Sequence, residues 1–265
     1  MTDAEISISA SDLIAQRSRL VKAAYRSGPI LPFGDDDPTF DVHGALAVRQ
    51  TTVDAWRSDG RRIVGRKIGL TSPALRERLG APQQTQGFLF ADTQVADGGV
   101  IDFNHLIQPL AEAELGLILA HDIDVVGNDP RALRSAIGGA TVAIEIVDCR
   151  FEDWRIGYAD AIADNGSAAG FVLSAERVPL VDADGKAWEM ERIGGAAHIS
   201  GGQVDLDAIL RDLHWLAKAA LAAREPLRRD EIILSGSLGG AIPMARGDAI
   251  SARIAGLGAC SVSFQ

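Results

Sequence analysis

Two glutamates two residues apart, Glu112 and Glu114, offer the clearest chemistry in this sequence. Side chains alternate along a strand with a period of two, so both carboxylates are expected on one face. Like charges held close together away from water repel each other unless a positive charge lies between them, and a divalent cation can supply that charge. The spacing is also typical of a solvated strand face, because such pairs are common.

A third acid favours the metal interpretation. Glu145 lies within the apolar run from Ala143 to Val147, and an acidic side chain is rarely buried without a partner. Three carboxylates suit a hard cation that prefers oxygen ligands, Mg²⁺ or Mn²⁺, rather than zinc. The sequence therefore predicts a metal site formed by Glu112, Glu114 and Glu145.

A lysine between glycines is the next candidate. Lys67 lies in the run from Gly65 to Gly69, and glycines allow a ligand to approach the backbone closely. A lysine there can hold a carboxylate or transfer a proton. The alternative is an ordinary surface lysine on an edge strand.

Two polar segments could also line a site. The first, from Asp160 to Ser167, has a composition typical of a turn. The second, from Ser235 to Gly240, resembles a loop that binds anions through backbone amides, but it lacks the lysine and spacing of a phosphate-binding P-loop. The five histidines (His43, His105, His121, His198 and His214) show no metal-ligand spacing, and His214 is expected to be structural.

Composition narrows the class of protein. The chain has 265 residues, of which 47% are hydrophobic and 23% charged, as is usual for a globular protein of one large domain. Its net charge of −10 argues against a nucleic-acid partner. Cys149 and Cys260 have no metal-ligand spacing, so we expect free thiols and a cytoplasmic location. Residues 1–5 lack the features of a signal peptide, and the apolar runs are too short to span a membrane.

The patterning divides the chain near residue 60. Helical periodicity over residues 9–28 and 41–58 predicts a small helical N-terminal subdomain, residues 1–60, with a polar loop at 34–38. In residues 61–265, short β-prone runs and helical patterns follow one another without regular β-α alternation. This pattern predicts an α+β fold with a β-rich catalytic core and disfavours a Rossmann or TIM-type sheet. The expected strands are 63–68, 87–90, 115–119, 141–147, 170–173, 231–234, 249–254 and 261–264, and the expected helices of the core are 73–79, 130–137 and 206–223.

Several segments together resemble the 2-keto-4-pentenoate hydratase and 4-oxalocrotonate decarboxylase family, within the fumarylacetoacetate hydrolase superfamily. They follow one another in the family's order from about residue 12 to the C-terminus. The matching segments are residues 64–72, 107–114, 143–148 and 163–165, Leu234-Ser235-Gly236, and Gly247-Asp248.

The resemblance implies a fumarylacetoacetate-hydrolase-like, mixed β-rich core with one bound Mg²⁺ or Mn²⁺. It assigns metal binding to Glu112, Glu114 and Glu145, and substrate contact with proton handling to Lys67. It places Leu70, Ser167, Ser235 and Gly236 at the substrate pocket. The members of this family are homo-oligomers, often pentamers or decamers, of aromatic meta-cleavage catabolism.

The activity that this resemblance implies is that of a lyase. A hydratase of this family adds water to 2-hydroxypenta-2,4-dienoate to give a 4-hydroxy-2-oxo acid, and a decarboxylase acts on 4-oxalocrotonate-type 2-oxo diacids. Hydration is the preferred expectation. The alternatives are decarboxylation, C–C hydrolysis, which usually needs a His–Glu pair near the metal, and a non-catalytic subunit that assembles with an active homologue. The presence of Lys67 and all three acids argues against the last of these.

Three residues depart from the family pattern. Hydratases of this family commonly carry Asp where this chain has Thr85, and Arg or Lys where it has Leu110. Gly166 replaces the usual Ala of an Asp-Asn-Ala-Ser segment. Since that Asp is a candidate for activating water, its absence bears on the choice between hydratase and decarboxylase.

Overall fold

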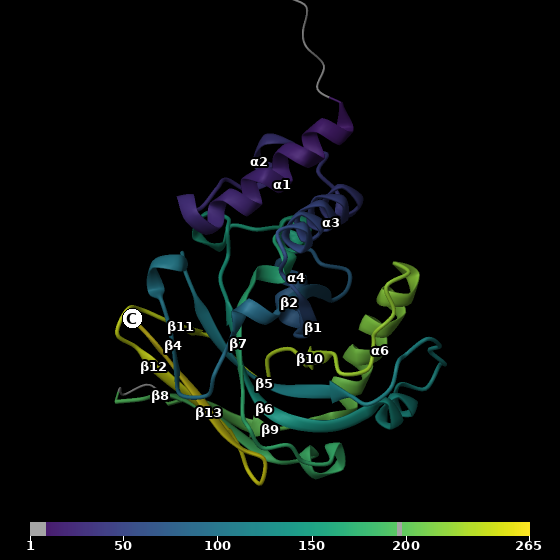
Figure 1. Cartoon of the computed structure of the whole chain (residues 1–265), viewed down its shortest axis with the longest axis vertical. Coiled ribbons are helices and arrows are strands. Elements are labelled where there is room, and N and C mark those ends of the chain that lie inside the picture. Colours follow the sequence, from purple (N-terminus) through teal and green to yellow (C-terminus); the bar gives the residue numbers. More distant parts are fainter. Residues whose placement is uncertain (1–8, 195–197) are drawn as a thin grey trace, which may run out of the picture.

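The computed structural model describes residues 9–194 and 198–265, so the segment on which we judged the signal peptide lies outside the described residues (Figure 1). Helices and strands occur in similar measure, which confirms the α+β class. The α-helices are α1 (Ala10–Ser27), α2 (Phe33–Asp36), α3 (Val42–Ser58), α4 (Pro73–Arg78), α5 (Tyr158–Ala163) and α6 (Leu206–Ala222). The strands are β1 (Ile63–Gly69), β2 (Thr85–Phe90), β3 (Gln94–Val95), β4 (Gly99–Ile101), β5 (Leu110–Leu119), β6 (Ile137–Val147), β7 (Ala168–Leu173), β8 (Ala187–Arg192), β9 (His198–Gln203), β10 (Ile232–Leu234), β11 (Ile242–Pro243), β12 (Ala249–Ile254) and β13 (Gly258–Phe264).

The N-terminal helices begin at side-chain caps. The hydroxyl of Ser9 accepts a hydrogen bond from the backbone N–H of Asp12, and the carboxylate of Asp41 accepts one from Gly44, which satisfies backbone donors at each helix start. Helices α1 and α3 pack against each other, and α3 packs on α5 (Figure 1). Their apolar side chains share one buried cluster with Phe151. The helical part is thus joined to the β-rich core by a common hydrophobic contact.

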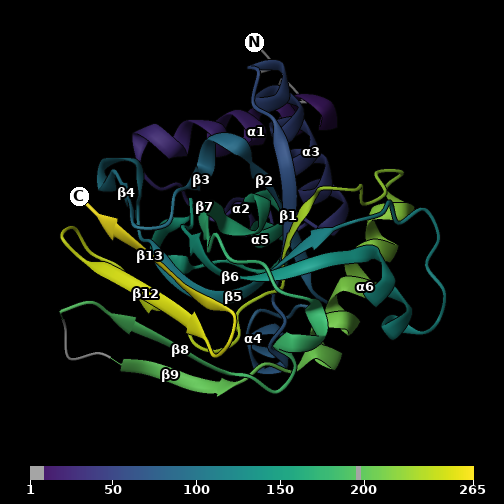
Figure 2. The same cartoon turned by 60° about the horizontal axis from the view of Figure 1, so that its bottom comes forward.

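Two mixed sheets form the β-rich part. The larger has the order β2-β1-β10-β5-β6-β7-β3, with β11 added beside β5, and the smaller has the order β4-β13-β12-β8-β9. Figure 2 shows the smaller sheet beneath the larger one. The main hydrophobic core lies between the sheets and extends to the apolar face of α6. Strands β5 and β6 therefore lie in the interior of the larger sheet, with neighbours on both sides.

Some elements differ from the expectations. Strand β5 begins at Leu110 rather than residue 115, because Ala111 and Ala113 point into the core and continue the alternation. Residues 33–36 form the one-turn helix α2 in place of a loop, and Pro130–Ala136 forms a 3₁₀-helix rather than an α-helix. The sequence reasoning missed α5, which it interpreted as a turn, and β8 and β9, which lack a continuous apolar run. No helix of the described residues is long and apolar enough to cross a membrane.

Candidate metal centre and active-site cavity

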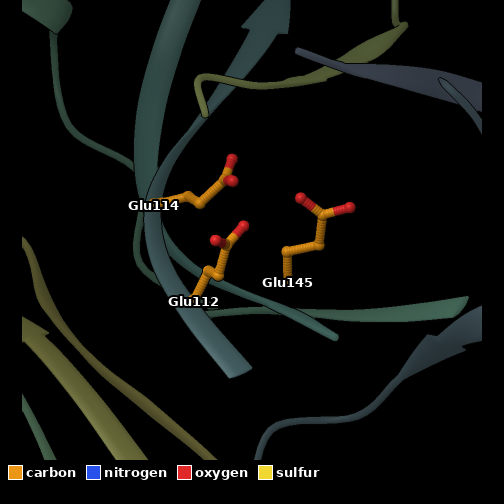
Figure 3. A group of neighbouring side chains, drawn as sticks. All are labelled: Glu112, Glu114 and Glu145. Carbon is orange, nitrogen blue, oxygen red and sulfur yellow. The ribbon is translucent and has the colours of Figure 1, made fainter. Parts of the chain in front are cut away.

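Glu112, Glu114 and Glu145 converge on one point. Each contributes one carboxylate oxygen to a group whose atoms all lie within 4.8 Å of one another. Figure 3 shows Glu112 and Glu114 on a single strand and Glu145 facing them. The three residues that the sequence predicted as metal ligands are thus brought together, and they come from two adjacent strands.

The ladder between β5 and β6 explains this convergence. Glu112 lies directly opposite Glu145, and Glu114 lies opposite Ala143. Residues two apart on a strand share a face, and cross-strand partners share it too. The intervening residues, Ala113 and Ile144, are buried in the main core on the other face. Alternation therefore separates an acidic face from an apolar one.

The electrostatics of the cluster call for a cation. Glu114 and Glu145 are fully buried. Oε1 of Glu114 and Oε2 of Glu145 have no hydrogen-bond partner among the described residues, and Oε1 of Glu145 has only its ion pair with Lys67. Two unit charges at this upper limit of 4.8 Å repel by about 3.5 kcal/mol at an effective dielectric constant of about 20, and closer charges repel more strongly. Buried oxygens without donors and with mutual repulsion fit a divalent metal that prefers oxygen ligands.

Lys67 supplies the nearest positive charge. It extends from β1, which is separated from β5 by β10. Its Nζ lies 3.1 Å from Oε1 of Glu145, and its side chain is 4% exposed. Burial alone lowers the pKa of this ammonium, but the charges of Glu145, Glu112 and Glu114 outweigh burial and raise it. Lys67 is therefore held in its protonated form beside the carboxylates.

The pKa values of two of the carboxylates also rise, which for an acid favours the neutral form. Burial, reinforced by the charge of Glu145, raises the pKa of Glu112 to about 7. The same two causes raise the pKa of Glu114 well above its ordinary value. One lysine is thus insufficient to keep the cluster fully ionised, and a bound divalent cation would favour the ionised form.

A cavity of about 400 Å³ opens at this cluster. Lys67 and Glu112 line its inner end, together with Leu70 and Ser167 from the sequence prediction. Its remaining lining is formed by Gly69, Ser72, Leu75, Arg78, Leu79, Thr85, Leu110, Val147, Trp154, Ile156, Ala161, Gly166 and Gly239–Ala241. All three residues that depart from the family pattern, Thr85, Leu110 and Gly166, therefore line the same cavity as Lys67.

Ser235 and Gly236 lie beside this cavity rather than in its lining. The Ser235 hydroxyl accepts a hydrogen bond from the backbone N–H of Leu115 and donates one to the carbonyl oxygen of Gly236. The N–H of Gly236 donates to Oε2 of Glu114 over 2.9 Å. Gly236 has a φ of +88°, and a Cβ there would lie 2.4 Å from Cγ2 of Thr71, so only glycine fits. These two residues hold Glu114 in place.

A buried ion pair supports the loop that carries Ser167. Arg150 and Asp164 are both inaccessible to solvent, and Nε of Arg150 lies 2.5 Å from Oδ1 of Asp164. The other carboxylate oxygen of Asp164 accepts a hydrogen bond from the Ser167 hydroxyl. The ring of Tyr25, from α1, lies 4.4 Å from the guanidinium of Arg150. Helix α1 thus contacts the ion pair that supports the loop at the cavity.

Several residues that line the cavity have an unusual backbone conformation. Leu70, Trp154 and Ser167 have φ values of +58°, +55° and +59°, a region that side chains other than glycine seldom adopt. Asn165 shares this conformation, and its side-chain amide pairs with both the N–H and the carbonyl oxygen of Phe88. Such strain persists where the surrounding structure imposes it, and it gathers at functional sites.

Sequence reasoning overlooked some of the supporting residues. Asp148 accepts hydrogen bonds from the backbone N–H groups of Ile107 and Gln108, which fixes the chain just before β5. Trp154 and Ile156 had no periodic signal, Asp148 was recognised only as part of a matching segment, and Asp164 and Asn165 only as parts of a matching segment and of the polar segment from Asp160 to Ser167.

Cys149 and His214 do not line the cavity. Burial raises the pKa of the Cys149 thiol to about 12, which disfavours a nucleophilic role. Nε2 of His214 lies 2.7 Å from the carbonyl oxygen of Gly127, as expected of a structural histidine.

Comparison with known proteins agrees with this geometry. The family described as fumarylacetoacetate (FAA) hydrolase C-terminal matches residues 79–265. The chain is 40% identical over 248 residues to 2-keto-4-pentenoate hydratase 2 of Dechloromonas aromatica (strain RCB), covering 92% of this chain and 95% of that protein. It is 36% identical to the TodF product hydratase of Pseudomonas putida (strain F1), covering 98% of each.

A solved structure matches nearly the whole chain. The 4-oxalocrotonate decarboxylase of Pseudomonas putida G7, complexed with magnesium and adipate, has a TM-score of 0.89 at 26% identity and covers 98% of this chain and 99% of its own. The fold and the site together define a fumarylacetoacetate-hydrolase-type lyase. The chain belongs to the fumarylacetoacetate hydrolase family, in the branch that contains the 2-keto-4-pentenoate hydratases.

Proposed function

We propose that this protein is a Mg²⁺- or Mn²⁺-dependent hydratase that adds water to a 2-hydroxypenta-2,4-dienoate-type substrate and forms a 4-hydroxy-2-oxo acid. The observation that carries the proposal is the cluster of Glu112, Glu114 and Glu145, with Lys67 beside it, at the inner end of a cavity. When bound, the metal supplies a Lewis acid that stabilises negative charge on the oxygens of a 2-oxo acid. The relatives named as hydratases support this reaction.

The chain's own residues have separate roles in this proposal. Lys67, protonated and lining the cavity, contacts the substrate and donates a proton to C5, while the enol proton of the C2 hydroxyl passes back to its amine, so that the dienol becomes the enone to which water adds at C4. Leu70 and Ser167 contact the substrate from the wall of the cavity. Ser235 and Gly236 act on the substrate through Glu114, whose carboxylate they position.

Decarboxylation of a 2-oxo diacid is the second candidate, and Thr85 is the residue that favours it. Thr85 is buried, lines the cavity and has no hydrogen-bond partner for its hydroxyl oxygen among the described residues. Thr85 provides no carboxylate to activate water. The similarity to a decarboxylase structure supports the same alternative.

Two substrates distinguish the reactions. Purified protein is incubated with 2-hydroxypenta-2,4-dienoate and with 2-oxohex-3-enedioate, each with Mg²⁺ and each with EDTA. Loss of the dienoate with formation of 4-hydroxy-2-oxopentanoate, only with metal, is expected. Release of CO₂ from the diacid without hydration of the dienoate would establish the decarboxylase instead.

Variants of the same protein test the metal assignment and the remaining alternatives. A Glu112→Gln protein that keeps full activity and metal binding would refute the metal assignment. Activity of the purified chain alone excludes a non-catalytic subunit. Cleavage of a C–C bond in an acylpyruvate would establish the hydrolase, although no histidine is among the described residues that line the cavity.

We further propose that the protein works as a homo-oligomer, a pentamer or decamer, in the cytoplasm, within meta-cleavage catabolism of aromatic compounds. The similarity to hydratases over nearly the full chain supports this setting. Light scattering of the purified protein measures the subunit number. Co-purification with a homologue encoded nearby would add a mixed complex to this description, and a monomer in solution would contradict the assembly.

A further inference from the structure

We propose that a second site, separate from the glutamate cluster, binds a small anion that carries a pyrophosphate group, either free or as part of a nucleoside diphosphate. The site is a groove of about 600 Å³ between the last turn of α3, the start of β1 and the segment that follows α6. Among the described residues it shares no lining residue with the active-site cavity. The site is independent of the proposed function, since it uses none of the residues assigned to that reaction.

Arginines gather along this groove from three separate parts of the chain. They are Arg57, Arg61, Arg62, Arg66, Arg224 and Arg228. The acids that line the same groove are Glu225 and Glu231, so positive groups outnumber negative ones on its wall. The whole chain has a net charge of −10, and this local excess of positive charge therefore runs against the composition. Such a concave basic surface attracts small anions.

Arg66 is the buried member of this group. Its side chain, which extends from β1, is 6% exposed. Nη2 donates to the carbonyl oxygen of Glu225 over 2.7 Å, and Nε lies 3.4 Å from Oε2 of Glu231. Nη1 has no hydrogen-bond partner in the part of the chain that the structure describes. Burial lowers the pKa of this guanidinium more than Glu231 and Glu225 raise it, so an anion bound nearby would stabilise its charge.

Arg66 lies on the other face of the sheet from the active site. Successive residues of a strand point to opposite faces, and its neighbour Lys67 contacts Glu145 in the metal cluster. Arg66 instead pairs across the ladder with Phe88, with its guanidinium 5.3 Å from the centre of the ring. The groove is therefore a separate surface and not an extension of the active-site cavity.

Two exposed arginines of the groove are available to a ligand. Arg62 and Arg224 form no salt bridge with any described residue, and both are exposed. The other three arginines face acids that lie outside the groove: Arg57 pairs with Asp54, Arg61 with Asp92, and Arg228 with Asp122 and Asp124. Exposed pairs of this kind contribute little free energy, so an anion can compete for these arginines as well.

The chemistry of the groove favours linked phosphates. The planar guanidinium group pairs with phosphate through two parallel hydrogen bonds. A pyrophosphate presents two phosphate groups with several charges, so it can pair with more than one arginine at once, which a monocarboxylate cannot. Ile63 and Pro226 also line the groove and offer an apolar contact to the organic part of a nucleoside diphosphate.

Calorimetry with three anions at one ionic strength tests the site. The protein is kept free of metal, because pyrophosphate would otherwise bind the divalent cation. The probes are inorganic pyrophosphate, ADP and sulfate. We expect the Kd of pyrophosphate to be at least about tenfold lower than that of sulfate. Tighter binding of ADP than of pyrophosphate would identify the nucleotide as the source of the group, and the reverse order would identify the free anion. Equal affinity for all three probes, or no binding, would overturn the proposal.

Variants of the exposed arginines locate the binding site. Arg62→Gln and Arg224→Gln should each raise the Kd of pyrophosphate about fivefold to tenfold. The matched control is Arg229→Gln, an exposed arginine close in sequence but outside the groove, which should keep the wild-type Kd. Lys67→Met should keep it too. An unchanged Kd in the double variant of Arg62 and Arg224, or loss of binding in Lys67→Met, would overturn the assignment. Arg66 is left intact, because its guanidinium also holds Glu231 and its loss would disturb the fold.

Discussion

Replacing Glu114 with glutamine removes one negative charge from the carboxylate cluster and keeps the side chain's shape. The amide oxygen can still accept the hydrogen bond from the N–H of Gly236, so the local structure is expected to persist. The variant should therefore separate the contribution of charge from that of packing. Its effect should differ in sign between the metal-free and the metal-loaded protein.

In the metal-free protein the substitution should be neutral or stabilising. Glu114 is fully buried beside two other carboxylates, and burial raises its pKa well above the ordinary value, which means that its ionised form costs free energy of folding. Glutamine carries no such cost. We expect the melting temperature in EDTA to equal or exceed that of the wild type.

In the presence of Mg²⁺ the order should reverse. A ligand at about a hundred times its dissociation constant stabilises the folded state by roughly 2.7 kcal/mol, or about 5–10 °C in a protein of this size. The wild type should gain this shift, and Glu114→Gln should gain less than about 2 °C. The matched control is Glu189→Gln, an exposed acid on β8 outside the cluster.

Differential scanning fluorimetry across a Mg²⁺ titration measures both effects. If Glu114→Gln keeps the full metal-dependent shift, the carboxylate is not a ligand. If the variant in EDTA melts several degrees below the wild type, the charge repulsion inferred from burial is wrong.

Three further predictions concern other parts of the molecule. Lys67→Met should lower kcat by about 10²–10⁴-fold, the usual contribution of a proton-transfer group, with an unchanged far-UV circular dichroism spectrum; a variant with wild-type kcat would remove Lys67 from the reaction. Arg150→Met leaves Asp164 buried and unpaired and should cost about 3–5 kcal/mol in urea denaturation, part of which the double variant with Asp164→Leu should restore. Hydrogen bonds from Thr39 and Arg17 lower the pKa of Asp37 to about 2, so its stabilising effect is complete above an unfolded pKa of about 3.9 and fades as pH falls toward 2. The stability difference between the wild type and Asp37→Asn should then shrink between about pH 4 and pH 2, and a constant difference would contradict this linkage.

The sequence predicted the site where the signal was local. A period of two is enough to place Glu112 and Glu114 on one face, and the structure agrees. The pairing of Glu112 with Glu145 could not be predicted from the sequence, because the register between β5 and β6 depends on contacts along the whole ladder. Lys67 stood out through its glycines, but its distance from Glu145 depends on β10, a strand from far along the chain.

Other residues that line the cavity could not be assigned this place from the sequence, for a different reason. Asp153 and Trp154 have a left-handed backbone conformation, and Ile156 follows them closely. Neither strand nor helix periodicity applies to such a segment. Leu110 was noticed because of its position before the acids, yet its place beside Val147 depends on the register of the ladder. Loop geometry and strand register are properties of the folded molecule, and single-residue patterns do not contain them.

The charges of the site favour one order of binding. If all three carboxylates were ionised, they and the protonated lysine would carry two net negative charges, which a divalent cation would neutralise and a monovalent cation would not. The chain also has a net charge of −10, so an anionic 2-oxo acid approaches against the overall field. A cation bound before the substrate would offset these charges and so favour capture of the substrate carboxylate.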